Sequence, residues 1–282
     1  YYTSSYRTEP YSLERIEVLR GPSAMLYGQG STAGVVNMVS KRPLGEAQRE
    51  VGVQLGNYGR KQVQADLTGP LTQDGQWLYR PVALARDSDT QVDHVPDDRK
   101  LIAPSITWKP SSATTLTLQA FWQRDETGST SQFFPWQGTV LPNGDNGRIP
   151  TSRFIGEPGF DRYDTERQYA GWLFEHRFDD TWTVRQNVRF AYNTVDYRSI
   201  YGNSFMPGQP YLNPPENTVM SRIVWGQQMQ THTATADQHV QANLITGAVK
   251  HEVLAGFDYV RSSTAEKRAG AADPAALFPI DV

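Results

Sequence analysis

The side chains that could support metal or acid–base chemistry are scattered through this 282-residue sequence. There is no cysteine, and the five histidines never recur at the short intervals that zinc sites use. No serine, histidine and aspartate stand in an order from which a hydrolase triad could be recognised. We therefore predict that the protein is not an enzyme, and that it has neither catalytic residues nor a resident metal or cofactor. The histidines are His94, His176, His232, His239 and His251.

Aromatic residues in two polar stretches, residues 131–140 and 199–210, are better candidates for binding. Aromatic side chains are unusual on polar loops, because nothing there buries them by default. They could form the walls of a site for a large organic ligand, or they could pack within their own loops. The residues concerned are Phe133, Phe134, Trp136, Tyr201 and Phe205.

The glycine-rich stretch from Glu14 to Pro43 does not fit a nucleotide site. Gly28-Gln29-Gly30 begins like a dinucleotide fingerprint, but Ala33 occupies the third glycine position and no Walker motif follows. The pattern instead predicts a strand, one helical turn over residues 22–27, a glycine loop and a returning strand. We expect a compact unit with α+β character.

From Glu50 onward the apolar residues recur with a period of two, which is typical of strands with one apolar and one polar face. In residues 182–193, for example, Val184, Val188 and Phe190 alternate with Arg185 and Arg189. We predict about nine strands of about ten residues each, a length typical of transmembrane barrels. Only the segment around Pro81 has an unclear alternation.

The predicted connections alternate between short and long. Aromatic residues flank the short ones, namely Trp77, Trp108, Phe178 and Trp182. Short turns at one end and long loops at the other are typical of a transmembrane antiparallel β-barrel, although a soluble β-sandwich would also alternate. The short turns are expected at residues 72–76, 109–114, 179–181 and 246–248, and the long loops at 90–99, 127–164 and 199 to about 227.

Composition is consistent with such a barrel. The net charge is −3 and the mean hydropathy is −0.57, and no run of about 18 apolar residues is present. These values exclude a helical membrane protein, and they give no reason to expect a nucleic-acid partner. A barrel that alternates lipid-facing and lumen-facing residues has a polar average.

The motifs of the glycine-rich stretch resemble the second half of the plug domain of TonB-dependent outer-membrane receptors. Within that family the stretch is most similar to the receptors for ferrichrome and other hydroxamate siderophores. The resemblance continues, more weakly, through the whole chain. The motifs that carry it are Pro10-Tyr11, Leu13-Glu14-Arg15, Arg20-Gly21-Pro22, Leu26-Tyr27-Gly28 and Asn37-Met38-Val39-Ser40-Lys41-Arg42-Pro43.

The resemblance implies that residues 1–45 are the C-terminal half of a plug and residues 46–282 the first strands of a 22-stranded barrel. It implies a receptor in the outer membrane of a Gram-negative bacterium that takes up a ferric siderophore. TonB would supply the energy through a segment preceding residue 1. A receptor for another nutrient, such as a cobalamin or a glycan, a passive porin-like protein and a soluble β-protein remain alternatives.

The resemblance also assigns ligand-binding roles. Tyr11 matches a plug tyrosine, and Phe133 and Tyr201 match aromatic positions of the third and fourth outer loops. With Trp136 and Phe205 they form the predicted ligand-binding set. Ser131 and Asn203 replace aromatics of the family, which leaves the ligand's identity open.

Four basic residues of the plug stretch, Arg15, Arg20, Lys41 and Arg42, could hold the plug in place. The resemblance implies that some of them pair with barrel glutamates beyond residue 282. For Lys41 and Arg42 we expect solvated charges instead.

Overall fold

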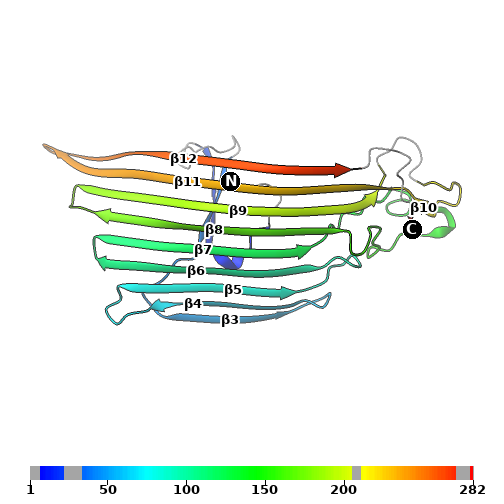
Figure 1. Ribbon diagram of the computed structural model, residues 1–282, viewed down its shortest axis with the longest axis horizontal. Coiled ribbons are helices and arrows are strands. Elements are labelled where there is room, and N and C mark those ends of the chain that lie inside the picture. The colour runs from blue at the N-terminus through cyan, green and yellow to red at the C-terminus, as the bar shows by residue number, and fades with distance from the viewer. Residues whose placement is uncertain (1–6, 22–33, 205–210, 271–279, 282) are drawn as a thin grey trace.

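The computed structural model describes residues 7–21, 34–204, 211–270 and 280–281 (Figure 1). Nine strands form one antiparallel sheet in the order β12-β11-β9-β8-β7-β6-β5-β4-β3, which confirms the prediction of an all-β wall of about nine strands. The strands are β3 (Gln48–Leu55), β4 (Lys61–Pro70), β5 (Trp77–Asp87), β6 (Asp97–Ser111), β7 (Thr114–Thr127), β8 (Arg162–Arg177), β9 (Trp182–Gly202), β11 (Arg222–Thr246) and β12 (Val249–Gly270).

The 3₁₀ turns that lie wholly within the described ranges are η1 (Pro10–Ser12) and η3 (Gly144–Asn146). None of the described residues forms a helix long and apolar enough to span a membrane. The predicted helical turn over residues 22–27 lies outside the described residues, so the expected α+β character of the plug is not seen.

The alternation predicted from the sequence is present in the sheet. In β9, Phe190 is 54% exposed on the outer face, whereas Arg189 points inward and stacks over the ring of Tyr169 at 4.5 Å. Strand β5 is also continuous. Pro81 lies opposite Pro104 of β6, so the two backbone N–H groups that the prolines lack are missing at a single position of the ladder. Its Leu78, Val82 and Leu84 are all buried on the inner face.

The strands on one side of the sheet are longer than predicted. Strands β9, β11 and β12 have 21, 25 and 22 residues, rather than about ten. At 3.3 Å per residue, 21 residues span about 70 Å, more than twice the ~30 Å hydrocarbon core. The expected loop from Ser199 is correspondingly shorter, because Arg222 pairs with Gly202 and the ladder continues beyond the membrane.

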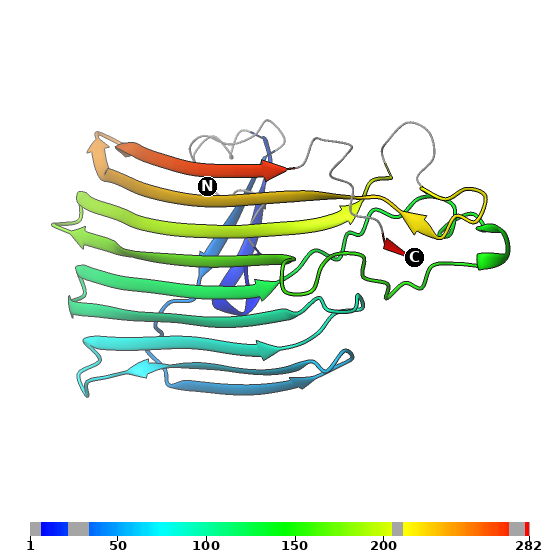
Figure 2. The ribbon, with the colours of Figure 1, turned by 45° about the vertical axis from the view of Figure 1, so that its right-hand side comes forward.

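Turns and loops lie at opposite ends of the sheet (Figure 2). The short connections after β4, β6, β8 and β11 are at one end, and the long ones after β5, β7 and β9 are at the other. At the turn end, the rings of Trp77 and Trp108 stack with centroids 5.8 Å apart, and Phe178 and Trp182 are exposed nearby. Exposed aromatics in this position are typical of an interfacial girdle.

A separate two-stranded sheet, β1 (Leu13–Leu19) and β2 (Val35–Ser40), lies against the inner face of the wall and crosses its strands steeply (Figure 2). Ile16 pairs with Met38, and neither strand joins the large sheet. Two other short strands, β10 (Val219–Met220) and β13 (Ile280–Asp281), pair beside the long loops.

Val188 offers a test of which face contacts lipid. This residue is outward by alternation and is 8% exposed, because it packs opposite Trp172. In the intact receptor, Val188→Arg should lower the unfolding free energy by about 2–4 kcal/mol, since the charge would enter the hydrocarbon region. Its inward neighbour provides the control, and Asn187→Arg should change the value by less than about 1 kcal/mol. Equal losses in both variants, measured by denaturant unfolding in lipid vesicles, would contradict the assignment of faces.

Candidate functional site

A buried arginine of the wall joins the N-terminal segment to two neighbouring strands. Arg99 of β6 donates from Nε to the Asp125 carboxylate of β7 at 2.6 Å and from a terminal nitrogen to Glu9 at 2.7 Å. All three side chains are almost inaccessible to solvent. Gln123 adds a 2.9 Å hydrogen bond to the carbonyl of Arg7. One cation therefore compensates two carboxylates, one of them from outside the wall.

A second cluster lies one strand further along and is centred on Arg80 of β5. Its guanidinium donates two hydrogen bonds of 2.9 Å to Asp66 of β4, and it reaches Glu14 at 3.1 Å and the carbonyl of Arg42 at 2.9 Å. Lys41 Nζ completes the cluster at 2.7 Å from Asp66. These contacts tie the first strand of the hairpin and the two residues after Ser40 to the wall.

The expectation that Lys41 is solvated was wrong. Its side chain is only 15% exposed and its partner is Asp66, so the counter-charge lies within this chain and not beyond residue 282. The Arg42 side chain reaches solvent, as expected, and Arg15 bonds Glu17 of its own strand at 2.6 Å. A lysine held in a buried ion pair is expensive to leave unpaired, which explains why it is enclosed with a carboxylate.

Tyr11 sits between the two ion clusters. Its ring packs against the buried residues Leu84, Leu101 and Phe121, and Lys41 Nζ lies 4.2 Å from the ring centroid. The hydroxyl is buried and has no hydrogen-bond partner among the described residues. Burial first, and then the nearby Glu50 carboxylate, raise the pKa of Tyr11 well above its usual value. The phenol therefore stays neutral, and the ring anchors the N-terminal segment to the wall.

A cavity adjoins this anchor on the side of the first strands. It is an open hollow lined by residues 7–11 and by side chains of β3 to β6, including Gln62, Arg86 and Arg99. Asp97 bonds Arg7 at 2.9 Å and Arg86 at 3.1 Å within it, so its positive charges are largely compensated. Tyr11 is only partly buried and borders this cavity.

The two long loops fold together into one unit. The connection after β7 (residues 128–161) supplies Ile155 and Phe134, and the connection after β9 (residues 203–221) supplies Tyr211 and Met220. Three of these side chains are buried together, and that of Phe134 is partly buried against them. The Tyr211 hydroxyl donates to the carbonyl of Gln137 at 2.7 Å.

Polar contacts reinforce the unit of the two loops. Arg222 donates to the carbonyls of Ile155 and Gly156 at 2.8 and 2.9 Å, and Asn143 donates to that of Asn217 at 2.8 Å. These contacts satisfy backbone carbonyls that would otherwise lack partners.

Although Tyr201 was predicted in a loop, it lies at the end of β9, where it meets Phe133 of the first loop at the inner edge of this unit. Their ring centroids are 5.1 Å apart. Phe133 has a φ of 54°, an uncommon conformation for an aromatic residue that the surrounding contacts must maintain. The strand end approaches closely enough that a Cβ on Gly202 would lie 2.7 Å from the Phe133 carbonyl oxygen. This position therefore requires glycine.

The other predicted site residues lie elsewhere. Trp136 is 71% exposed on a tight turn of the first loop, and Tyr11 packs against the wall. Phe205 lies outside the described residues.

Sequence reasoning missed the carboxylates and arginines of the two ion clusters. A signal was available, because Asp66, Arg80, Arg99 and Asp125 occupy the same inward face of four successive strands with both charge signs present. Within the described ranges, no three histidine, aspartate or glutamate side chains lie where they could hold a metal ion together.

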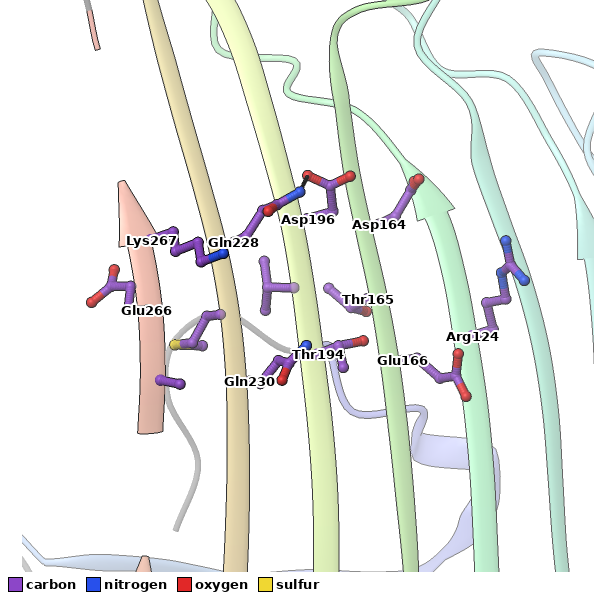
Figure 3. A pocket seen from close by; sticks show the side chains of 13 residues that line it. Arg124, Asp164, Thr165, Glu166, Thr194, Asp196, Gln228, Gln230, Glu266 and Lys267 are labelled. Atoms are coloured by element: carbon purple, nitrogen blue, oxygen red, sulfur yellow. Dashed lines mark hydrogen bonds between the residues drawn. The ribbon is translucent and has the colours of Figure 1, made fainter. Parts of the chain in front are cut away.

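The outward positions become polar toward the loop end. In Figure 3, Asp164, Glu166, Asp196, Gln228 and Lys267 gather in a hollow formed by neighbouring strands. Gln228 donates to Asp196 at 3.4 Å, and Arg124 pairs with Glu126 at 2.8 Å. Charged side chains on the face that carries Trp122 and Phe190 indicate that the strands have left the hydrocarbon region there.

Strands long enough to cross a membrane, with a separate hairpin ion-paired to their inner face, define the class as part of a plugged transmembrane barrel. The family profile described as "TonB dependent receptor-like, beta-barrel" matches residues 107–280, and the "TonB-dependent Receptor Plug Domain" profile matches residues 1–35. The chain belongs to the TonB-dependent receptor family. These receptors are outer-membrane proteins of Gram-negative bacteria and are not enzymes, which locates this chain in that membrane.

Two curated relatives are each 33% identical to this chain. The "Ferrioxamine B receptor" of Salmonella typhimurium (strain SL1344) aligns over 257 residues, 91% of this chain and 35% of its own length. The "Ferrichrome outer membrane transporter/phage receptor" of Escherichia coli (strain K12) aligns over 264 residues, 90% of this chain and 35% of its own length. The chain thus spans about a third of the length of these relatives.

Solved structures share the fold. The closed form of the ferric-catecholate import receptor Fiu of E. coli K12 has a TM-score of 0.78 at 21% identity, covering 90% of this chain and 37% of that one. The pyoverdine receptor FpvA of Pseudomonas aeruginosa PAO1 has a TM-score of 0.77 at 19% identity, covering 93% of this chain and 37% of that one.

Removing the cation of the first cluster should loosen the plug segment. Arg99→Leu would leave Glu9 and Asp125 buried without a counter-charge, and we expect a loss of about 3–5 kcal/mol in the intact receptor. Arg124→Leu is the matched control, because its pair with Glu126 is exposed and should be worth about 0–1 kcal/mol. Thermal unfolding in detergent, together with proteolysis of residues 7–21, measures both effects. A loss no larger for Arg99→Leu than for the control would show that the cluster does not hold the segment.

Proposed function

We propose that the intact protein is a TonB-dependent receptor that takes up a ferric siderophore of the hydroxamate type. The observation that supports this most directly is the similarity, over nine-tenths of the chain, to proteins named as ferrioxamine and ferrichrome receptors. The paired aromatics at the inner edge of the loops fit such a ligand, because its iron is already wrapped by the chelator. The receptor then needs apolar walls and hydrogen-bond donors instead of metal ligands.

In this proposal, residues 1–45 form the last part of the plug and residues 46–282 the first strands of a barrel of 22. The separate β1–β2 sheet and the ion clusters that join it to the wall support that division. TonB would act through a segment that precedes the plug residues, and the plug would be rearranged to let the ligand pass.

The proposed binding set is Tyr11, Phe133, Trp136, Tyr201 and Phe205. Phe133 and Tyr201 form one aromatic wall at the mouth, and the exposed Trp136 extends it outward. The partly buried ring of Tyr11 borders a cavity, through which it would form the bottom of the binding vestibule. Phe205 belongs to the set as an aromatic residue of the polar stretch 199–210.

An uptake experiment separates the proposal from its alternatives. Cells lacking their own hydroxamate receptors and carrying the complete gene should accumulate radiolabelled iron from a ferric trihydroxamate, and the uptake should stop when TonB is deleted. Cobalamin and oligosaccharide uptake in the same cells should remain at background. TonB-independent entry would indicate a porin-like protein, and uptake of cobalamin without iron would assign a different nutrient.

The aromatic pair should contribute measurably to affinity. Tyr201→Ala and Phe133→Ala should each weaken ferric-siderophore binding several-fold, because stacking of one aromatic adds about 0.5–1.5 kcal/mol beyond burial. Phe178→Ala, at the opposite turn end, should bind like the wild type. The measurement is equilibrium binding to cells that display equal amounts of each receptor. Unchanged affinity in both loop variants would remove the pair from the site.

A further inference from the structure

The plug hairpin is ion-paired to one side of the wall and faces a gap on the other. Its described ion pairs to the wall, through Glu14 and Lys41, go to Arg80 of β5 and Asp66 of β4. Toward β8, β9 and β11, a cavity of about 390 Å³ lies between strand β2 and the inward side chains of the wall. That volume is near the lower end of the ~300–1,000 Å³ range of small-molecule sites.

The gap is lined by hydrogen-bond donors and by cations. Arg42 lies on the plug side, and Arg167 and Arg189 lie on the wall, with amide groups such as Asn37 and Asn187 between them. Among the described residues that line the gap, Asp237 is the one carboxylate, and it is within 3.1 Å of His239 Nδ1. Three arginines against one carboxylate give this space a positive potential.

The two wall arginines are held along the wall by aromatic rings. The Arg189 guanidinium lies 4.5 Å from the Tyr169 centroid, and that of Arg167 lies 5.5 Å from Phe121. Such stacking orients a guanidinium. Arg167 also donates to the carbonyl of Arg7 at 3.5 Å and to Thr8 Oγ1 at 3.3 Å.

Arg42 is exposed to the same positive potential. The enclosing plug and wall first, and then the like charges of Arg15 and Arg189, lower the pKa of Arg42, although its side chain still reaches solvent. In the cavity beside Tyr11, by comparison, Glu9 and Asp97 are bonded directly to arginines.

We propose that this gap is a second, lumenal subsite for the ferric chelate, and that it selects by charge. It rests on the proposed function and deepens it by naming the substrate class. Guanidinium and amide donors match carbonyl and carboxylate oxygens on the outside of a chelate, whereas a chelate with a free ammonium group is repelled. The receptor therefore passes neutral or anionic trihydroxamates faster than cationic ones.

The test uses three ferric chelates built on one trihydroxamate that ends in an amine. The amine is left free, acetylated or succinylated, which gives cationic, neutral and anionic ligands with the same iron core. For the intact receptor in cells, we measure equilibrium binding without TonB energy and the saturated rate of iron uptake with it. We expect the succinylated chelate to be transported roughly fivefold faster than the free amine, from the repulsion of unit charges at partly screened sites.

Two variants alter the charge of the gap, and one serves as a control. In Arg189→Gln the ratio of the two rates should fall toward one, and in Asn187→Asp, which keeps all arginines, it should fall as well. Arg124→Gln, on the outer face and paired with Glu126, should keep the wild-type ratio.

The outcomes separate the subsite from the proposed function. Binding of all three chelates with equal uptake rates, or a rate ratio that survives both gap variants, overturns the charge-selective subsite and leaves siderophore uptake standing. Failure of every chelate to bind overturns the proposed function, and the subsite with it.

Discussion

Compensation of buried charge on the inner face of the wall is the constraint on which the other features depend. An arginine removed from water needs compensating partners, and Arg80 and Arg99 each have one carboxylate on a neighbouring strand and another on the plug segment. Because each cluster is incomplete without the plug residue, the wall fixes the position of the hairpin. The ring of Tyr11 then packs against the apolar part of the wall between the Arg80 cluster and the Arg99 cluster.

The same constraint makes the lumen asymmetric. Carboxylates balance the arginines where the plug is anchored, toward β4 to β7, but arginines outnumber carboxylates toward β8 to β11. The plug segment is ion-paired to the wall on one side. On the other side a polar cavity adjoins it, and Ser40 and the Tyr169 hydroxyl of β8 share a hydrogen bond of 3.1 Å. Its buried side resists separation, whereas the polar lining of the gap tolerates water or a polar ligand.

The local sequence pattern was enough to predict much of the fold but little of the candidate site. The alternation of Val184, Arg185, Phe190 and Arg189 was enough to assign the faces of β9, because a period of two is a property of the strand itself. The enclosure of Lys41 was not predictable in that way, since Asp66 reaches it only through the placement of the hairpin on the wall. The excess length of β11 and the backbone of Phe133 likewise depend on partners far along the chain.

The shared core of the two long loops has a consequence for how such a receptor changes its ligand. Ile155 and Met220 belong to different connections but are buried in the same apolar cluster. Arg222, which follows the second connection, donates a hydrogen bond to the Ile155 carbonyl of the first. The two loops therefore form one structural module. Exchange of either segment alone between related receptors would separate half of a core from its complement, so new specificities should arise by concerted substitution in both segments or by recombination across residues 128–221 as a block.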